Sequence, residues 1–136
     1  MDGEIVAFFQ RYQDEWVSTL SGDRVAEFYT MPCAALRSDG DFVTLETRME
    51  VVAFFQHIIE SYLRRGFDSW TQTWVSVQRL GSRAAIATMD WEAWNTEGVS
   101  VAAWRQSYNL VRLPDGWRIA ITIVHVLEAT DDDDDA

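Results

Sequence analysis

Apolar side chains recur at three- and four-residue spacing in the first twenty residues of the chain. They are Ile5, Phe8, Phe9, Tyr12, Trp16 and Leu20. This spacing places them on one face of a helix, and the pair Ser21-Gly22 is expected to end that helix. A short second helix is predicted for residues 23–29, ahead of Pro32.

Residues 33–37 and 42–45 flank the polar run Ser38-Asp39-Gly40-Asp41, which predicts a hairpin. Thr47 followed three residues later by Glu50 has the form of a capping box, so a third helix is expected to begin there. One face of this helix carries Val51, Phe54, Phe55, Ile58 and Tyr62. Gly66 followed by Phe67 predicts its end.

From residue 69 the apolar period changes to two, which predicts four long strands at 69–80, 83–95, 101–113 and 117–127. The last turn, Pro114-Asp115-Gly116, favours a type I turn whose glycine takes a left-handed bulge position and so fixes the pairing register. Helices followed by an antiparallel meander indicate an α+β fold, with helices packed on one face of a curved sheet.

The predicted turns decide which side chains share a face of this sheet. A two-residue turn at Gly81-Ser82 would place Thr73 opposite Asp90, and one at Glu97-Gly98 would place Asp90 opposite Arg105. The last turn would place Arg105 opposite His125. The face predicted to point inward holds Thr73, Val75, Val77, Ile86, Thr88, Asp90, Arg105, Ser107, Asn109, Val111, Trp117, Ile119, Ile121, Ile123 and His125. The other face holds Trp70, Gln72, Trp74, Met89, Trp91, Trp104, Gln106, Tyr108, Thr122 and Val124. A three- or five-residue connection at residues 96–98 would exchange the last two strands between the faces, and Asp90 would then lose both Arg105 and His125.

The order helix, short helix, hairpin, helix and four strands over residues 3–128 resembles the nuclear transport factor 2-like (NTF2-like) superfamily, including its SnoaL-like branch. The segments 105–111 (RQSYNLV) and 116–119 (GWRI) are similar to the closing hairpin of that superfamily. The resemblance implies a cystatin-like cone, in which the sheet wraps around the N-terminal helices and leaves a cavity at its open end. Members include isomerases, dehydratases, polyketide cyclases and non-catalytic binding or dimerisation modules.

The amino-acid composition indicates the number of domains and excludes some classes of binding partner. The 136 residues suit a single domain over 1–128, followed by an acidic tail at 129–136 that is expected to be disordered. The net charge is −11, which argues against nucleic acid and anionic membranes as partners. All eleven basic residues are arginines, so Schiff-base chemistry is excluded.

The compartment follows from two further features. Cys33 is the only cysteine, which excludes an internal disulfide and favours a reducing compartment. No apolar run approaches the roughly 20 residues that span a bilayer. We therefore expect a cytoplasmic protein.

Asp90, Arg105 and His125, on three neighbouring strands, form the best candidate catalytic group. Asp90 or His125 could move a proton while Arg105 holds a developing oxyanion. The alternative is a cross-strand ion pair between Asp90 and Arg105, with His125 near the rim. With two histidines, one cysteine and no closely spaced ligand motif, we expect no metal and no cofactor.

A candidate ligand pocket would be lined by Tyr12, Trp16, Tyr29, Thr88, Ser107, Asn109 and Ile123. Tyr12 and Trp16 could equally be core residues. Relatives that resemble ketosteroid isomerases carry a base Asp on an early strand, and residues 33–36 have no carboxylate there. Dehydratase-like relatives use a histidine pair, for which His57 and His125 are the only candidates.

Four indoles and a phenol on an open sheet face would exceed the apolar patch usual for a monomer. We therefore predict a homodimer through Trp70, Trp74, Trp91, Trp104 and Tyr108. The predicted function is a SnoaL-like protein whose apolar pocket binds a small hydrophobic molecule, with cofactor-independent isomerisation, cyclisation or dehydration if it is catalytic. The alternative is a non-catalytic ligand-binding or dimerisation module.

Overall fold

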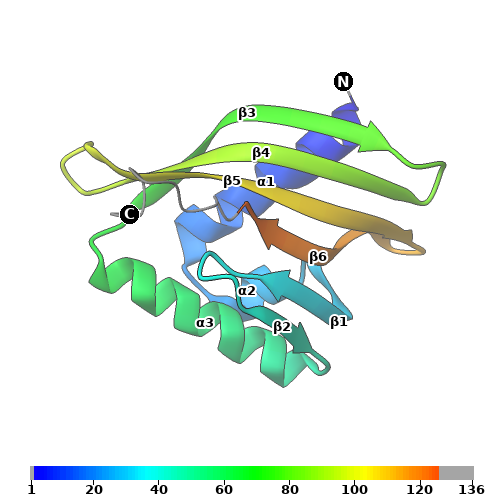
Figure 1. Cartoon of the computed structure of the whole chain (residues 1–136), viewed down its shortest axis with the longest axis horizontal. Helices are drawn as coiled ribbons and strands as arrows, with labels where there is room; N and C mark the ends of the chain where they lie inside the picture. Colours follow the sequence, from blue (N-terminus) through cyan, green and yellow to red (C-terminus); the bar gives the residue numbers. More distant parts are fainter. Residues whose placement is uncertain (1, 126–136) are drawn as a thin grey trace.

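Three helices pack against one face of a curved six-stranded sheet in the computed structural model, which describes residues 2–125 (Figure 1). The helices are α1 (Gly3–Thr19), α2 (Gly22–Ala26) and α3 (Arg48–Arg64). The strands are β1 (Tyr29–Leu36), β2 (Phe42–Leu45), β3 (Ser69–Arg79), β4 (Ala84–Trp94), β5 (Ser100–Leu113) and β6 (Gly116–Val124). The predicted tail at 129–136 lies outside the described residues.

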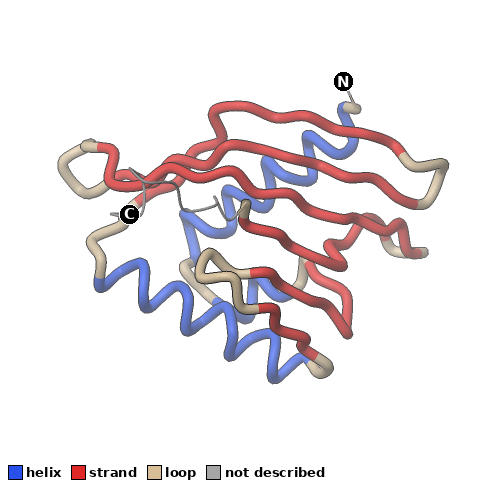
Figure 2. The backbone as a smooth tube through the Cα atoms, viewed as in Figure 1, coloured by secondary structure: helices blue, strands red, loops and turns tan. Residues whose placement is uncertain are grey.

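The strand order in the sheet is β2-β1-β6-β5-β4-β3. The predicted α+β fold with a curved sheet is confirmed, but the sheet is mixed and not antiparallel throughout. β1 runs parallel to β6, with Ala34 opposite Ile121 and Leu36 opposite Ile123. Figure 2 shows this arrangement, with α3 alongside the short β1–β2 hairpin and the long strands β3 to β5 at the other side of the molecule. In the described part of the chain, no helix is long and apolar enough to cross a membrane.

Local sequence signals set the helix ends. The Asp2 carboxylate accepts hydrogen bonds from the backbone N–H groups of Glu4 and Ile5 and so caps α1. The Thr47 hydroxyl accepts from the N–H of Glu50 at the start of α3, at the predicted capping box. Gly66, with φ +83°, ends α3 where predicted.

The register between β4 and β5 is the predicted one: Asp90 lies opposite Arg105 and Thr88 opposite Ser107. The turns of all three hairpins nevertheless differ from the predicted ones. The N–H of Asn95 donates to the carbonyl of Val99, so the turn between β4 and β5 has three residues and not two, and a register shift between Ala93 and Trp94 restores the predicted pairing along the rest of the two strands. The N–H of Leu80 donates to the carbonyl of Ala84, so the first turn has three residues and not two. A register shift between Gln72 and Trp74 then brings the start of β3 back to the expected pairing.

In the last hairpin, between β5 and β6, the bulge does not lie at the turn, where it was predicted. Leu113 pairs with Gly116, not with Trp117, and the extra residue of β6 is Ala120, between Ile119 and Ile121. An extra residue reverses the alternation of side chains along a strand. Trp117 and Ile119 are therefore buried, and they do not share a face with Ile121 as predicted.

The predicted orientation of the sheet is wrong, because the tryptophan-rich face points toward the helices. Trp70, Trp91 and Tyr108 are at most 5% exposed and belong to the core. Their rings meet the aromatic stripe of α1: the ring centroids of Phe9 and Tyr108 are 4.8 Å apart. β4 contributes Ala85, Ala87, Met89 and Ala93 to the same face. These side chains are mostly small and leave room for the rings of α1.

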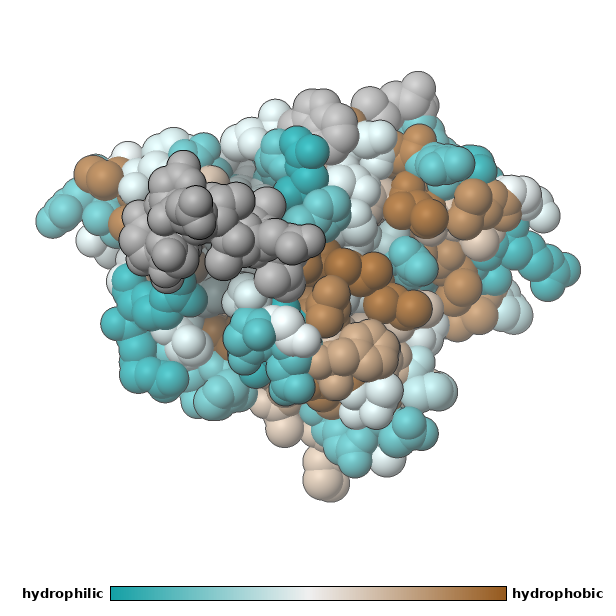
Figure 3. Space-filling model, viewed as in Figure 1, coloured by the Kyte–Doolittle hydropathy of each residue, from teal (hydrophilic) through white to brown (hydrophobic). Residues whose placement is uncertain are grey.

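The opposite, outer face carries most of the residues that were predicted to point inward; the exceptions are Val75, Val77, Trp117 and Ile119, which belong to the core or pack against it. Asp90, Arg105 and Ser107 lie on the outer face, together with the half-buried Ile121 and Ile123. Figure 3, which views the molecule from this side, shows apolar side chains gathered over β6 and β1 with polar groups around them.

Ionic and aromatic contacts tie the first turn of α1 to the sheet. The guanidinium carbons of Arg79 and Arg112 lie 5.0 and 5.6 Å from the ring centroid of Trp117. Both guanidiniums donate to the Glu4 carboxylate at 3.1 Å, and Arg79 also pairs with Asp2. This end is closed by packing and charge, and the cavity lies elsewhere, toward α3.

Candidate functional site

A cavity of about 600 Å³ lies between the inner face of the sheet, α1 and α3. This volume falls within the range of small-molecule sites, roughly 300–1,000 Å³. Its wall is dominated by aromatic rings: Tyr12, Trp16, Tyr29, Phe54, Phe55, Tyr62, Phe67, Trp70, Trp91, Trp104 and Tyr108. The cavity is therefore suited to a flat, largely apolar molecule.

Three buried tyrosines supply polar groups to this wall. The hydroxyls of Tyr12 and Tyr29 are 2.6 Å apart, and the indole N–H of Trp91 donates to the Tyr108 hydroxyl at 2.8 Å. Burial raises the pKa of each of these three phenols above the usual value of 10. All three hydroxyls are therefore protonated at neutral pH and can donate hydrogen bonds.

These donors exceed the acceptors around them. Each phenol has one hydrogen to donate. In the Tyr12–Tyr29 pair one hydroxyl donates to the other, and no described residue accepts the hydrogen of the Tyr108 hydroxyl. The buried indole N–H of Trp70 also lacks an acceptor within the described part of the chain. A ligand oxygen would satisfy such groups.

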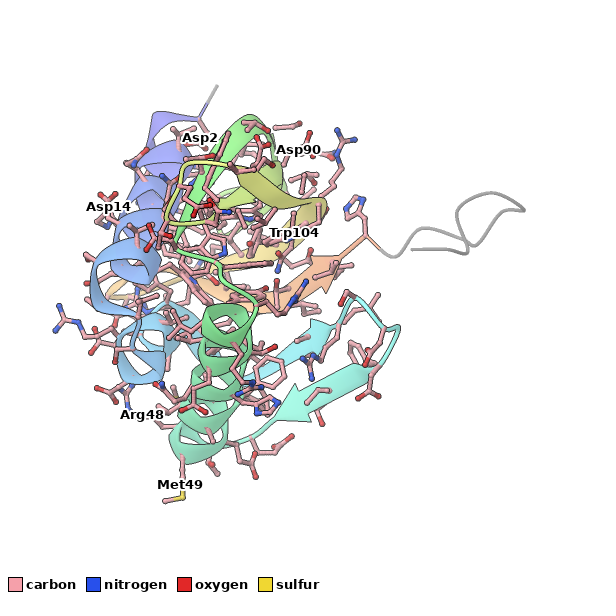
Figure 4. The ribbon with its side chains drawn as sticks, turned by 90° about the vertical axis from the view of Figure 1, so that its left-hand side faces the viewer. Asp2, Asp14, Arg48, Met49, Asp90 and Trp104 are labelled. Atoms are coloured by element: carbon pink, nitrogen blue, oxygen red, sulfur yellow. The ribbon has the colours of Figure 1, made fainter. Side chains whose placement is uncertain are left out.

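A second polar row crosses the sheet floor at Gln106. Trp104 Nε1 donates to Gln106 Oε1 at 2.8 Å, and Gln106 Nε2 donates to the Thr122 hydroxyl. Figure 4 shows Trp104 between the sheet and the end of α3. The sequence analysis placed Trp104 in the predicted subunit contact and Gln106 and Thr122 on the same sheet face, although a glutamine and a threonine among tryptophans were a signal of a polar-lined pocket.

Two arginines stand at the pocket wall. The guanidinium carbon of Arg37 is 5.5 Å from the Phe54 ring centroid, and that of Arg65 is 4.6 Å from the Phe67 ring centroid. Burial raises the pKa of Tyr62, while the positive charges of Arg65 and Arg37 act in the opposite direction. Neither arginine was singled out from the sequence, because exposed arginines near a helix end or in a turn are common.

The predicted group Asp90, Arg105 and His125 does assemble, but on the outer face. Arg105 Nε and Nη2 donate to the two carboxylate oxygens of Asp90 at 2.7 and 3.1 Å. This hydrogen bonding lowers the pKa of Asp90. Ser107 Oγ lies 2.7 Å from His125 Nε2 and 2.7 Å from the Thr88 hydroxyl. Asp90 lies at the outer edge of the sheet in Figure 4.

The residues predicted to form the pocket and the catalytic group fall into two sets, one at the cavity and one on the outer face. Tyr12, Trp16 and Tyr29 line the cavity, and His125 reaches its rim. The expectation that the remaining predicted residues line it is wrong, because the outer face carries them: Asp90, Arg105, Thr88, Ser107, Asn109 and Ile123.

His57 and Cys33 take no part in the cavity. His57 is exposed on α3 and does not border the cavity, so it forms no pair with His125 there. Cys33 is a buried free thiol whose pKa burial raises to about 11, which makes it a poor nucleophile. Residues 2–125 contain no group of three or more His, Cys, Asp or Glu side chains that could hold a metal ion.

The chemistry available inside the cavity is hydrogen-bond donation. Among residues 2–125, no Asp or Glu borders it. His125 is the histidine that borders the cavity, at its rim. The interior can therefore hold an oxygen acceptor or a developing oxyanion, while proton transfer would have to take place at the rim.

Solved structures share this fold over nearly the whole chain. The yeast UBP3-associated protein BRE5 is 18% identical over 93% of this chain and 95% of its own, with a TM-score of 0.71. A putative calcium/calmodulin dependent protein kinase II association domain from Xanthomonas campestris is 14% identical, with coverages of 95% and 91% and a TM-score of 0.71. An NTF2-like protein with a cystatin-like fold from Novosphingobium aromaticivorans is 15% identical, with coverages of 94% and 82% and a TM-score of 0.72.

At these identities the likeness concerns the fold alone, and it confirms the predicted cystatin-like architecture. A search of curated protein sequences finds no match. A family model described as NTF2-like protein (DUF6841) matches residues 3–126. The chain therefore belongs to this family of NTF2-like proteins.

Proposed function

We propose that this protein binds a small, largely apolar and partly aromatic molecule in the cavity between the sheet, α1 and α3. The observation that carries the proposal is a cavity of about 600 Å³ walled by aromatic rings, with tyrosine hydroxyls among them. Burying such surface of a ligand contributes roughly 25 cal/mol per Å². Apolar contact therefore supplies the affinity, and the hydroxyls supply orientation.

The polar groups favour a ligand with at least one acceptor oxygen. The Tyr108 hydroxyl and the Trp70 indole each have a hydrogen without an acceptor among the described residues. A carbonyl or ether oxygen of the ligand would accept a hydrogen bond from either group. This supports a ligand such as an aromatic ketone or ester over a plain hydrocarbon.

Catalysis of the SnoaL-like kind extends this proposal. In a cofactor-independent isomerisation, cyclisation or dehydration, the phenols of Tyr12 and Tyr108 would stabilise an enolate oxygen. His125 at the rim would take up or deliver the proton. The absence of Asp and Glu from the described pocket wall makes ligand binding the better supported part.

A second candidate function is protein association. Ile86, Ile121 and Ile123 are half-buried on the outer face and leave apolar surface there. Two relatives of the same fold are named for association, one with UBP3 and one as a kinase association domain. Cavity and outer face lie on opposite sides of the sheet, so the two functions would not compete for surface.

The test of ligand binding uses N-phenyl-1-naphthylamine, a neutral aromatic probe that fluoresces in apolar surroundings. We expect the probe to bind at one site per chain. Ser61 on α3 borders the cavity, and Ser61→Phe should reduce the affinity about tenfold or more by occupying the space. Ala53→Phe is the matched control, because Ala53 is exposed on the same helix and does not border the cavity.

Equal binding by wild type, Ser61→Phe and Ala53→Phe would show that the probe sits elsewhere and would refute this site. No binding by the wild-type protein at micromolar probe would refute the proposed function. Circular dichroism and thermal melting of the three proteins establish that each is folded.

A further inference from the structure

The charge of the cavity wall differs in sign from that of the molecule. The chain has a net charge of −11. The fully charged groups that border the cavity are nevertheless two guanidiniums, those of Arg37 and Arg65, and no carboxylate borders it among residues 2–125. An acidic protein with a positive pocket selects ligands by charge.

The two arginines of the cavity wall come from different elements, and the charges of both act on the Tyr62 phenol. Arg37 follows the last residue of β1 and lies over Phe54, while Arg65 caps α3 and lies over Phe67. The guanidinium carbon of Arg65 is also 6.0 Å from the ring centroid of Tyr62. Stacking on a ring holds the plane of a guanidinium and leaves its N–H edge free to donate.

Neither guanidinium is neutralised within the described part of the chain. Arg24, Arg48, Arg79, Arg105, Arg112 and Arg118 all pair with carboxylates. No described carboxylate lies within ion-pair distance of Arg37 or Arg65. Arg64, next in sequence, is exposed and does not border the cavity, so it provides an internal comparison.

We propose that the ligand of this cavity is an anion: an apolar, partly aromatic molecule whose carboxylate, or a group of equivalent charge, is held by Arg37 and Arg65. The inference rests on the proposed function. Guanidinium and carboxylate are complementary in charge and in planar hydrogen-bond geometry. The Tyr62 hydroxyl, which borders the same wall, is a further donor to the anion.

A matched pair of probes separates charge from apolar contact. N-phenyl-1-naphthylamine is neutral, and 8-anilinonaphthalene-1-sulfonate is the same ring system with one anionic group. In Arg37→Gln/Arg65→Gln we expect the affinity for the anionic probe to fall about tenfold or more, since each charged hydrogen bond contributes to it. The affinity for the neutral probe should change less than about twofold, because apolar contacts are kept.

Arg64→Gln is the charge-matched control for the single variant Arg65→Gln, since each removes one positive charge from the same end of α3 and Arg64 does not border the cavity. It should leave the affinity for both probes unchanged. A loss in Arg64→Gln equal to that in Arg65→Gln would overturn the inference, because it would indicate a general effect of net charge. An unchanged affinity for the anionic probe in the double variant would also overturn it.

The wild-type protein gives a test that does not depend on how the double variant folds. Raising the salt concentration from about 0.05 to 0.5 M should weaken binding of the anionic probe and not of the neutral one. Equal salt dependence of the two probes would overturn the inference. Binding of the neutral probe with no role for Arg37 or Arg65 would leave the proposed function in place, whereas failure of both probes to bind would refute both.

Discussion

At the residue scale, the four tyrosines of the chain share one property. Burial raises the pKa of Tyr12, Tyr29, Tyr62 and Tyr108 above the usual value of 10. We predict that the folded protein shows little tyrosinate absorbance at pH 10, while the protein in denaturant ionises about half of its phenols there. Absorbance at the tyrosinate band during an alkaline titration measures both. A folded-state transition near pH 10 would contradict this prediction.

The same pKa values set a pH dependence of stability. A phenol whose pKa is higher in the folded state than in the unfolded state stabilises the fold at pH values below 10. That contribution is lost as the pH rises through 10 toward the folded value, because the unfolded chain releases its protons first. The melting temperature should therefore begin to fall above about pH 10.

The hydrogen bond between Tyr12 and Tyr29 gives a second prediction at this scale. Both hydroxyls are buried and 2.6 Å apart. Tyr29→Phe should lower the free energy of unfolding by about 1–2 kcal/mol, because the Tyr12 hydroxyl loses its partner in an apolar site. Tyr12→Phe/Tyr29→Phe should cost less than the sum of the single changes. Urea denaturation of the four proteins measures the coupling, and strict additivity would contradict a direct bond.

At the element scale, α2 approaches α3 closely because residue 22 has no side chain. A Cβ atom on Gly22 would lie 2.6 Å from the carbonyl oxygen of Val52 and 2.8 Å from the backbone nitrogen of Gln56. Both are backbone atoms, so relief requires the helices to separate. We predict that Gly22→Ala destabilises the protein by about 1–3 kcal/mol.

Gly3→Ala is the matched control, because a Cβ atom there meets nothing within 4 Å. Alanine also favours a helix over glycine by up to about 1 kcal/mol, so this variant should be as stable as the wild type or slightly more stable. Thermal and urea melts of the two variants decide the matter. Equal stability of both variants would show that α2 and α3 can separate enough to accommodate the Cβ atom at little cost in free energy.

The sequence predicted elements and much of their pairing, and the reason is that these features depend on local signals. The N-cap of α3 at Thr47 and its end at Gly66 each depend on a few neighbouring residues. The predicted pairing of Asp90 with Arg105 is observed although the turn at residues 96–98 has three residues and not two, because a register shift between Ala93 and Trp94 compensates for the extra turn residue. The extra residue Ala120 could not be foreseen, because a bulge depends on how two strands pack against α1 and β1 and not on turn chemistry.

At the scale of the whole molecule, the direction of the sheet was the feature that sequence reasoning missed. Both faces of the strands are apolar enough to be core, one rich in isoleucine and valine and the other in tryptophan. The choice is made by the fit between Phe9 and Tyr12 of α1 and the rings of Trp91 and Tyr108. This fit involves segments that are distant in sequence. It therefore cannot be predicted from the alternation of apolar and polar residues along a strand.

That correction changes the surface on which the predicted homodimer depends. Trp70, Trp91 and Tyr108 are covered by the chain's own helices and cannot form a subunit contact. The prediction of a homodimer therefore moves to the outer face around Ile121 and Ile123. Light scattering coupled to size exclusion should give about twice the chain mass of 15.6 kDa at micromolar concentration. A mass of one chain would contradict it.

A charge placed on the outer face tests the location of the contact. Ile121→Asp should shift the dimer toward monomer by about tenfold or more in dissociation constant, because an unpaired carboxylate would have to be desolvated in the interface. Met49→Asp is the control: Met49 is 80% exposed and projects from the far end of α3 (Figure 4). A dimer that Ile121→Asp leaves intact would place the contact elsewhere. Since Ile121 does not border the cavity, neutral-probe binding should survive dissociation, which separates assembly from ligand recognition.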